Sequence, residues 1–453
     1  EPVTGELPST NSLFKTTINM AWPSMVESFL VALVGFIDTI MVSTLGSYAI
    51  AAVGLTQQPK FIGLALFMSM STAISALVAR RRGEQNRESA VRILKTCILV
   101  AVILTAIISV TFTAFADPII RFAGSADDTH EAAVEYFQII MGGMMFNIIS
   151  MAINAAQRGA GNTKIAMRTN VTSNVVNMIG NYLLIQGNLG FPKLGITGAA
   201  LATVFGTVIA CLMSILSVMK RDNFVSIPFI IKEKVRVTLE PAKNMFKVAS
   251  SVFVEQIFMR IGFLTVSIMV AKLGTDAFAA HQVGMNVMSL SFSFGDGMQV
   301  AAVALCGRSL GEKRPDLAQM YGTICQRIGN MISIVLAVLY TTLGTWYFHL
   351  FFDEPHLVAM GVEITRVLTF IVLLQIAQVI YMGCLRGAGD VVFTTIASTI
   401  SITFVRPILS YVFCYACGLG LVGIWLGILG DQTSRLLLTT WRFKSGRWMK
   451  IEI

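Results

Sequence analysis

The sequence is poor in charge. Only 13% of its 453 residues are Asp, Glu, Lys or Arg, and 55% are hydrophobic. Soluble globular domains carry about 25% charged residues, which keep their surfaces in contact with water. This chain has too little charge for such a surface, so its composition predicts an integral membrane protein.

Motifs for nucleotide and metal chemistry are also missing. The sequence contains no GxxxxGK[ST] phosphate loop. Its seven cysteines lie in or beside hydrophobic segments, without the spacing of a zinc site or of a disulfide framework. Cys414 and Cys417 form a CxxC pair, which we interpret as a packing feature of an apolar segment. We therefore predict no enzymatic activity, no cofactor and no metal centre.

Long apolar runs recur along the whole chain. Each is near or above the roughly 20 residues that a helix needs to cross the hydrocarbon core of a bilayer. The runs lack the alternation of polar and apolar residues that is typical of a membrane barrel. We therefore predict an all-α integral membrane protein. Its twelve transmembrane helices are predicted at 16–45, 52–79, 93–116, 133–157, 165–187, 195–219, 247–273, 279–306, 324–352, 358–384, 391–417 and 420–441.

Lys and Arg concentrate in alternate loops. The loops between them hold few basic residues, and two of these, at 115–135 and 352–356, are acidic. This positive-inside pattern predicts a multi-pass protein of the cytoplasmic membrane with both termini cytoplasmic. The net charge of +9 then reflects topology and contact with anionic membrane lipids, and not a nucleic-acid partner.

The sequence repeats itself. A shift of 228 residues aligns "IMVSTLG" at 40–46 with "IMVAKLG" at 268–274, and "RGAGN" at 158–162 with "RGAGD" at 386–390. Each half holds an even number of predicted spans, so both halves enter the membrane from the same side. We predict two six-helix bundles that are related by a pseudo-two-fold axis along the membrane normal.

The repeat defines the predicted domains and narrows the class of protein. The domains are an N-terminal cytoplasmic segment at 1–15, an N-lobe at 16–219, a cytoplasmic linker at 220–246, a C-lobe at 247–441 and a cytoplasmic tail at 442–453. Parallel halves of this kind usually enclose a central cavity that opens to either side. No soluble segment except the linker is long enough to bind a nucleotide, so a secondary transporter is the favoured class.

Among the acids inside predicted spans, three qualify as candidate functional residues: Glu27, Asp38 and Glu255. An ionisable side chain at the centre of a membrane helix costs roughly 2.5–3.5 kcal/mol, so each acid is a candidate functional residue. Glu27 and Glu255 are equivalent under the 228-residue shift. Asp38 lies three turns after Glu27 and on the same stripe of the helix. Each acid either faces an aqueous cavity or is satisfied by a polar neighbour, which for Glu255 includes Gln256 and Arg260.

A carboxylate in such a cavity suggests a mechanism. It can hold a proton or a cationic compound but not both, so the two compete for one negative site. The 24 Met and 29 Phe residues suit a polyspecific apolar wall, although most of them serve as packing or lipid-facing residues.

Several motifs resemble those of one family. They are "FIDTIMVSTLG" at 36–46, "NMIGNYLL" at 177–184, "LGITGAALAT" at 194–203, "AAHQVGMNVMSLSF" at 279–292 and the paired "RGAG" turns. From about Leu13 to Trp441 the chain resembles the multidrug and toxic compound extrusion (MATE) transporters, particularly their NorM-like bacterial branch. The resemblance implies two six-helix bundles that export cationic, amphipathic compounds in exchange for protons or sodium ions.

The resemblance also implies roles for individual residues. It assigns the N-lobe acid to Asp38, the polar partners of that acid to Asn177, Asn181 and Thr203, and the seventh-helix glutamate to Glu255. Gln375 stands where sodium-coupled members have an aspartate. The resemblance implies no role for Glu27. If Na⁺ is the coupling ion, the resemblance implies a site either at Asp38 with Asn177 and Asn181 or at Glu255 with Gln375, and the neutral Gln375 weakens the second of these. The missing aspartate favours proton coupling through Asp38.

These observations predict a secondary active multidrug efflux antiporter. It would act as a monomer, bind small organic cations and other xenobiotics, and exchange them for H⁺ or Na⁺ by alternating access. The alternative is a lipid-linked oligosaccharide flippase of the same superfamily. Such a flippase uses a cationic cavity for pyrophosphate, whereas the predicted cavity charges here are mainly acidic. A receptor or scaffold function would not explain the repeat or the intramembrane acids.

Overall fold

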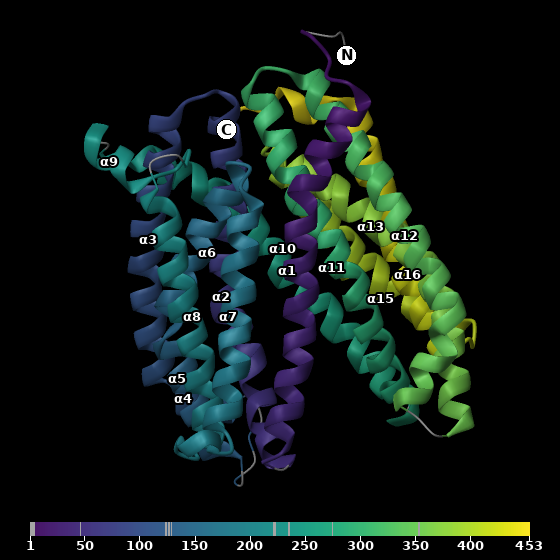
Figure 1. Ribbon diagram of the computed structural model, residues 1–453. Helices are drawn as coiled ribbons and strands as arrows, with labels where there is room; N and C mark the ends of the chain where they lie inside the picture. The colour runs from purple at the N-terminus through teal and green to yellow at the C-terminus, as the bar shows by residue number, and fades with distance from the viewer. Residues whose placement is uncertain are drawn as a thin grey trace. The chain divides into compact units, whose positions relative to one another are not determined.

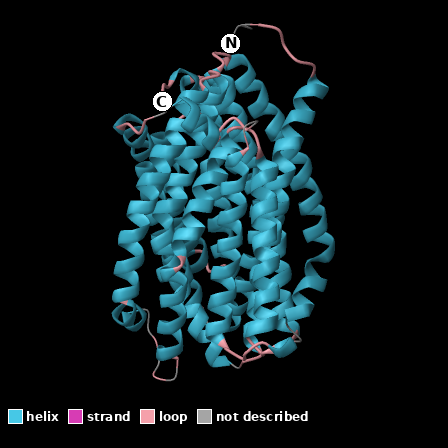
Figure 2. Cartoon of the chain, turned by 60° about the vertical axis from the view of Figure 1, so that its left-hand side comes forward, coloured by secondary structure: helices cyan, strands magenta, loops and turns pink. Residues whose placement is uncertain are grey.

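A computed structural model describes most of the chain, namely residues 5–45, 47–122, 125, 127, 129–220, 223–233, 236–273, 275–351 and 354–453. The described residues form helices and connecting loops without any strand, as Figure 2 shows. Gly46 and Gly274, which end the two copies of the repeated motif, lie outside the described residues, as do parts of both acidic loops.

The helices follow one another with short connections (Figure 1). The first half of the chain contains α1 (Thr10–Ser43), α2 (Ser47–Gly83), α3 (Arg87–Ala114), α4 (Ala116–Phe122), α5 (His130–Gly142), α6 (Met144–Gly159), α7 (Thr163–Leu184), η1 (Asn188–Gly190), α8 (Ile196–Met219) and α9 (Ile227–Glu233). The second half contains α10 (Leu239–Ala271), α11 (Thr275–Gly311), α12 (Pro315–Phe351), α13 (Pro355–Gly387), α14 (Val391–Ser398), η2 (Thr399–Val405), α15 (Arg406–Tyr411), η3 (Val412–Ala416), α16 (Leu421–Ser445) and η4 (Arg447–Lys450).

Many of these helices are suited to a bilayer. Among the described residues, eight helices are long and apolar enough to cross a membrane, and the bent pair α5 and α6, which turns by 45°, brings the number to nine. The other three predicted spans fall on α7, α10 and α16, which carry polar side chains. Every predicted span thus coincides with a helix or a run of adjoining helices, and the count of twelve stays a prediction.

The repeat in the sequence has a counterpart in the backbone. A Cβ atom on Gly159 would collide with the carbonyl oxygen of Ser75, and one on Gly387 would collide with that of Val303. Both residues of the first pair are related to those of the second by the 228-residue shift. The two "RGAG" turns therefore use glycine for the same close helix contact, of α6 with α2 and of α13 with α11.

The turns before the last helices also match. Gly195 precedes α8 with a φ of 63°, and Gly420 precedes α16 with a φ of 62°. Left-handed backbone of this kind favours glycine, because a side chain there would clash with the backbone. This requirement explains the first glycine of "GITG" and of "GLVG".

The contacts within the chain separate two compact units. We call Phe29–Ala249 the N-unit, and Glu1–Ser28 together with Ser250–Ile453 the C-unit. The boundary falls inside α1 and inside α10, so residues 16–28 of the predicted N-lobe belong to the C-unit. Met25 of α1 packs against Gly297 of α11 there, and the Ser28 hydroxyl donates to Asp296 Oδ2 at 3.1 Å.

Each unit has its own interior. In the C-unit, buried apolar side chains of α11, α12, α13 and α16 form one large core, which the start of α1 joins through Leu13, Met20 and Ala21. In the N-unit, α7 lies along α8, and α6 contacts α2, α3 and α8. The polar side chains described next lie inside these otherwise apolar bundles.

Candidate functional site

The N-unit gathers the predicted polar residues around Asp38. Asn177 Nδ2 donates to Asp38 Oδ2 at 3.1 Å, and Asn181 Nδ2 donates to Asp38 Oδ1 at 2.8 Å. The Thr203 hydroxyl lies 3.3 Å from Asn177 Oδ1, to which it donates, and 3.0 Å from the carbonyl oxygen of Ala199. The sequence-based grouping of Asp38, Asn177, Asn181 and Thr203 therefore corresponds to one hydrogen-bonded cluster.

The helices explain why these side chains converge. Asn177 and Asn181 are four residues apart on α7, so they project from the same face toward α1. Both are buried, whereas Asp38 is half-buried. Gly180 packs closely against Ala202, which brings α7 near α8 and places Thr203 within reach of Asn177.

Two further side chains join the cluster. Tyr136 of α5 is buried near Thr203 and interacts electrostatically with Asp38. Lys60 of α2, which the sequence did not single out, also interacts electrostatically with Asp38. The Lys60 side chain lines a small cavity of about 40 Å³ together with Thr203 and Asn147. Tyr136 gave no sequence signal, but a lysine inside the predicted span 52–79 could have been noticed.

The cluster can hold a proton or a cation. Asp38 supplies the carboxylate, and the amide oxygen of Asn181 is buried without a hydrogen-bond partner among the described residues. A buried acceptor without a partner is costly and suits a ligand that donates a hydrogen bond or brings positive charge. Na⁺, like other hard cations, is bound by oxygen ligands. The residues present therefore fit H⁺, an organic ammonium or Na⁺.

Glu255 of the C-unit lies in a different environment. The residue is 3% exposed, and Arg386 Nη2 donates to its Oε1 atom. Arg386 belongs to the second "RGAG" turn and lies in the last turn of α13. Within the part of the chain that the structure describes, Glu255 Oε2 has no hydrogen-bond partner. The acid is thus paired with a polar neighbour, Arg386, and not with its neighbour Gln256 on the helix. A direct pair with Arg260 is disfavoured by the spacing of the two residues around the helix.

Gln375 does not share this position. It is buried on α13 and accepts a hydrogen bond from the Ser291 hydroxyl at 3.4 Å. Gln375 precedes Arg386 by eleven residues, which corresponds to about 16 Å along a helix. Among the described residues no hydrogen bond joins Gln375 with Glu255, so a sodium site made by these two residues stays a prediction without a geometric counterpart.

Glu27 is buried on α1, next to Ser28 and within the C-unit. Asp38 on the same helix belongs to the N-unit. The two acids that the sequence placed on one stripe therefore take part in different packing units. No role beyond its buried position follows for Glu27.

The C-unit holds a buried charged cluster that the sequence-based prediction did not include. Arg406 Nε donates to Asp431 Oδ2 at 2.7 Å, and Arg435 Nε donates to Asp431 Oδ1 at 3.1 Å. The guanidinium of Arg406 also lies over the ring of Phe263, at 4.9 Å. All three charged residues fall inside predicted spans, so the same cost argument that selected Glu255 could have selected them.

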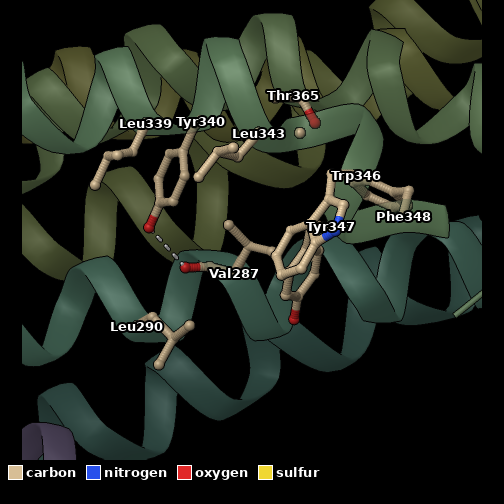
Figure 3. A pocket seen from close by; sticks show the side chains of 10 residues that line it. Val287, Leu290, Leu339, Tyr340, Leu343, Trp346, Tyr347, Phe348 and Thr365 are labelled. Carbon is tan, nitrogen blue, oxygen red and sulfur yellow. Dashed lines mark hydrogen bonds between the residues drawn. The ribbon is translucent and has the colours of Figure 1, made fainter. Parts of the chain in front are cut away.

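The C-unit also contains an aromatic pocket of about 200 Å³ (Figure 3). Its wall includes Tyr340, Trp346 and Tyr347 of α12, and the Tyr340 hydroxyl donates to the carbonyl oxygen of Val287 at 3.1 Å, shown as a dashed line in Figure 3. None of the described residues that line this pocket is acidic. The pocket therefore offers apolar surface but no exchangeable charge.

The fold and the Asp38 cluster together define an all-helical, multi-pass membrane protein with a carboxylate held inside its spans. The model of the MatE family matches residues 23–183 and 251–412, which is more than half of the chain, so the chain belongs to the MatE family. The second match begins at 251 and the first at 23, a difference of 228 residues, which is the shift of the sequence repeat.

Known relatives span nearly the whole chain. The probable multidrug resistance protein NorM of Thermotoga maritima is 28% identical over 444 residues, which cover 96% of this chain and 93% of the relative. The uncharacterized transporter YisQ of Bacillus subtilis is 25% identical over 443 residues, with 97% and 95% covered. A crystal structure of MATE in complex with MaL6 matches with a TM-score of 0.88 at 23% identity, over 96% of this chain and 97% of the other.

These comparisons confirm two predictions. The resemblance to MATE transporters with NorM-like members is confirmed, and so is the all-α membrane fold. The MATE family consists of transporters and not of enzymes. The roles of the individual site residues stay predictions.

Proposed function

We propose that this protein is a secondary active antiporter that exports cationic and amphipathic organic compounds in exchange for H⁺, with Na⁺ as the alternative coupling ion. The observation that carries the proposal is the Asp38 carboxylate, which two amide groups hold inside a membrane-spanning bundle. The relative named as a probable multidrug resistance protein supports the choice of substrate class.

The geometry supplies the exchange step. Asp38 offers a negative charge that either a proton or a cationic group can neutralise. Asn177 and Asn181 donate hydrogen bonds to the ionised carboxylate and so fix its position. A proton arriving from outside removes the charge and releases the compound, and loss of that proton to the cytoplasm restores the site. Alternating access would keep these two events on opposite sides of the membrane.

The proposal includes the setting of the protein. We infer that it acts as a monomer in the cytoplasmic membrane. Both termini would lie in the cytoplasm, because the basic loops alternate with poorly charged ones. The flippase alternative would need positive charge for a pyrophosphate group. A carboxylate at the centre of the N-unit cluster disfavours that substrate.

The test uses everted membrane vesicles from cells that produce the protein. A fluorescent organic cation is offered with only a proton gradient, or with only a sodium gradient, and its accumulation is measured. We expect accumulation with the proton gradient that exceeds the level of vesicles without the protein. Accumulation with the sodium gradient alone would assign Na⁺ as the coupling ion, and none with either gradient would refute the antiporter.

A further inference from the structure

A lysine lies in the Asp38 cluster, where the proposed function would place a cationic substrate. Lys60 belongs to α2, at the start of the candidate span Pro59–Gly83. Its side chain lines the cavity that Thr203 also lines, and Thr203 connects through Asn177 to Asp38. Lys60 and Asp38 are close enough to interact electrostatically. An ammonium group and a carboxylate thus occupy the same polar cluster.

The charges in this part of the N-unit cancel. The other described residues that line the cavity with Lys60 are apolar or neutral and polar, and include Asn147, Thr203 and Thr207. Tyr136, which also reaches the cluster, carries a neutral phenol at physiological pH. The ammonium of Lys60 therefore balances the carboxylate of Asp38 when both are ionised.

A balanced pair selects its ligands differently from an isolated carboxylate. A small monocation or Na⁺ gains attraction from Asp38 but meets repulsion from Lys60, so its net electrostatic gain is small. A compound with both an amine and an acid group is attracted at both ends. The amine approaches Asp38, and the acid group approaches Lys60. Charge complementarity of this kind discriminates between ligands more than it raises the affinity for all of them.

We propose that Lys60 is a built-in counter-cation of Asp38, and that the N-unit cluster consequently prefers zwitterionic compounds to simple monocations, Na⁺ included. This inference rests on the proposed export function, for which it specifies the charge of the substrate. It also assigns Lys60 as a residue that determines specificity, beside the acid that exchanges the proton.

The test uses two dyes that differ by one ester group. Rhodamine 6G is a monocation, and its free acid, rhodamine 19, adds a carboxylate to the same ring system. The ratio of their dissociation constants is measured by fluorescence with the purified protein, and then with Lys60→Met and Lys60→Arg. Methionine keeps an unbranched side chain of similar length without the charge, and arginine keeps the charge.

We expect the wild-type protein and Lys60→Arg to bind rhodamine 19 more tightly, and Lys60→Met to shift the ratio at least about tenfold toward rhodamine 6G. Thermal stability of Lys60→Met should also rise with added NaCl, relative to choline chloride, whereas that of the wild-type protein should not. An unchanged ratio in folded Lys60→Met would overturn the inference. If Lys60→Met does not fold, a wild-type preference for rhodamine 6G overturns it instead.

Export measurements separate this inference from the proposed function. If wild-type vesicles export either dye but the Lys60→Met ratio is unchanged, the function stands and the role of Lys60 is wrong. If the ratio shifts while neither dye is exported with any gradient, the charge selectivity stands and the antiporter is wrong.

Discussion

Asp38 and Glu255 are both acids inside membrane bundles, but their nearest partners differ. Neutral amides of Asn177 and Asn181 hold Asp38, which is half-buried, and Lys60 approaches it from a cavity. Glu255 is almost fully buried and pairs directly with Arg386. Amide donors fix a carboxylate and leave its charge open to exchange, whereas a contacting arginine neutralises it permanently.

Burial alone therefore does not identify an acid that exchanges protons. On burial, Glu255 would be the stronger candidate, yet Arg386 compensates its charge in a direct ion pair, whereas Lys60 acts on Asp38 without such a contact among the described residues. Asp431 follows the same rule, because Arg406 and Arg435 surround it. We therefore infer that the N-unit acid performs the coupling step and that the C-unit acids hold helices together.

The largest effect should come from Asp38→Asn. This change keeps the shape of the side chain but removes the exchangeable charge, so gradient-driven export should fall by about 100-fold or more, to the level of vesicles without the protein. Substrate binding should remain measurable. Asp117→Asn, the same chemical change at an exposed residue of α4, serves as the control and should export normally. Full export by Asp38→Asn would remove the basis of the comparison.

The next effect concerns the stability of the Glu255–Arg386 pair. Removing one partner leaves the other as a buried, unpaired charge, so Glu255→Gln and Arg386→Gln should each lower the free energy of unfolding by about 3–5 kcal/mol. The double variant, which removes both charges, should lose less than either single variant. Thermal unfolding can be followed with a thiol-reactive dye, because six of the seven free cysteines are buried.

Transport measurements complete this test. Folded Glu255→Gln should still export the dye in exchange for protons, because the exchanging carboxylate is elsewhere. Loss of export with unchanged stability would instead show that Glu255 takes part in ion exchange, and the distinction between the two acids would fail.

A smaller effect tests whether the two halves depend equally on their "RGAG" turns. Gly159→Ala and Gly387→Ala would each press a methyl group against a carbonyl oxygen of the neighbouring helix. Overpacking of this kind costs about 1–3 kcal/mol, and we expect similar losses in both halves. Gly142 and Gly295 have no such close neighbour and give the matched alanine controls. Unequal losses would show that the repeated contact supports only one unit.

Much of this architecture could be predicted from the sequence. Hydrophobic runs and internal repeats are visible in the sequence itself, so the helices and the 228-residue repeat could be found without tertiary information. The Asp38 cluster was predicted through the resemblance to a family, because nothing in the spacing alone brings α1, α7 and α8 together.

Other features required the fold. Lys60 falls inside the predicted span 52–79 but was not among the candidate residues, because only the structure places it beside Thr203. Arg386 was interpreted as part of a turn, and its partner Glu255 is 131 residues away in the chain. Pairs that are so distant in sequence depend on helix packing, which composition and periodicity do not determine.

The smallest effect is expected at Asp117, an acid outside the predicted spans that gives a reference for the two buried ones. A hydrogen bond with His130 lowers the pKa of Asp117 below its ordinary value of 3.8, and Arg121 adds to the shift. A lowered pKa in the folded protein stabilises it at pH values above about 3.8, and this contribution is lost as the pH falls through the folded pKa. The wild-type protein should therefore unfold at a slightly higher temperature than Asp117→Asn at neutral pH, and the difference should disappear under more acidic conditions. The effect should be small, because water surrounds this group and screens its charge. A difference that grew as the pH fell below 3.8 would contradict the assigned direction of the shift.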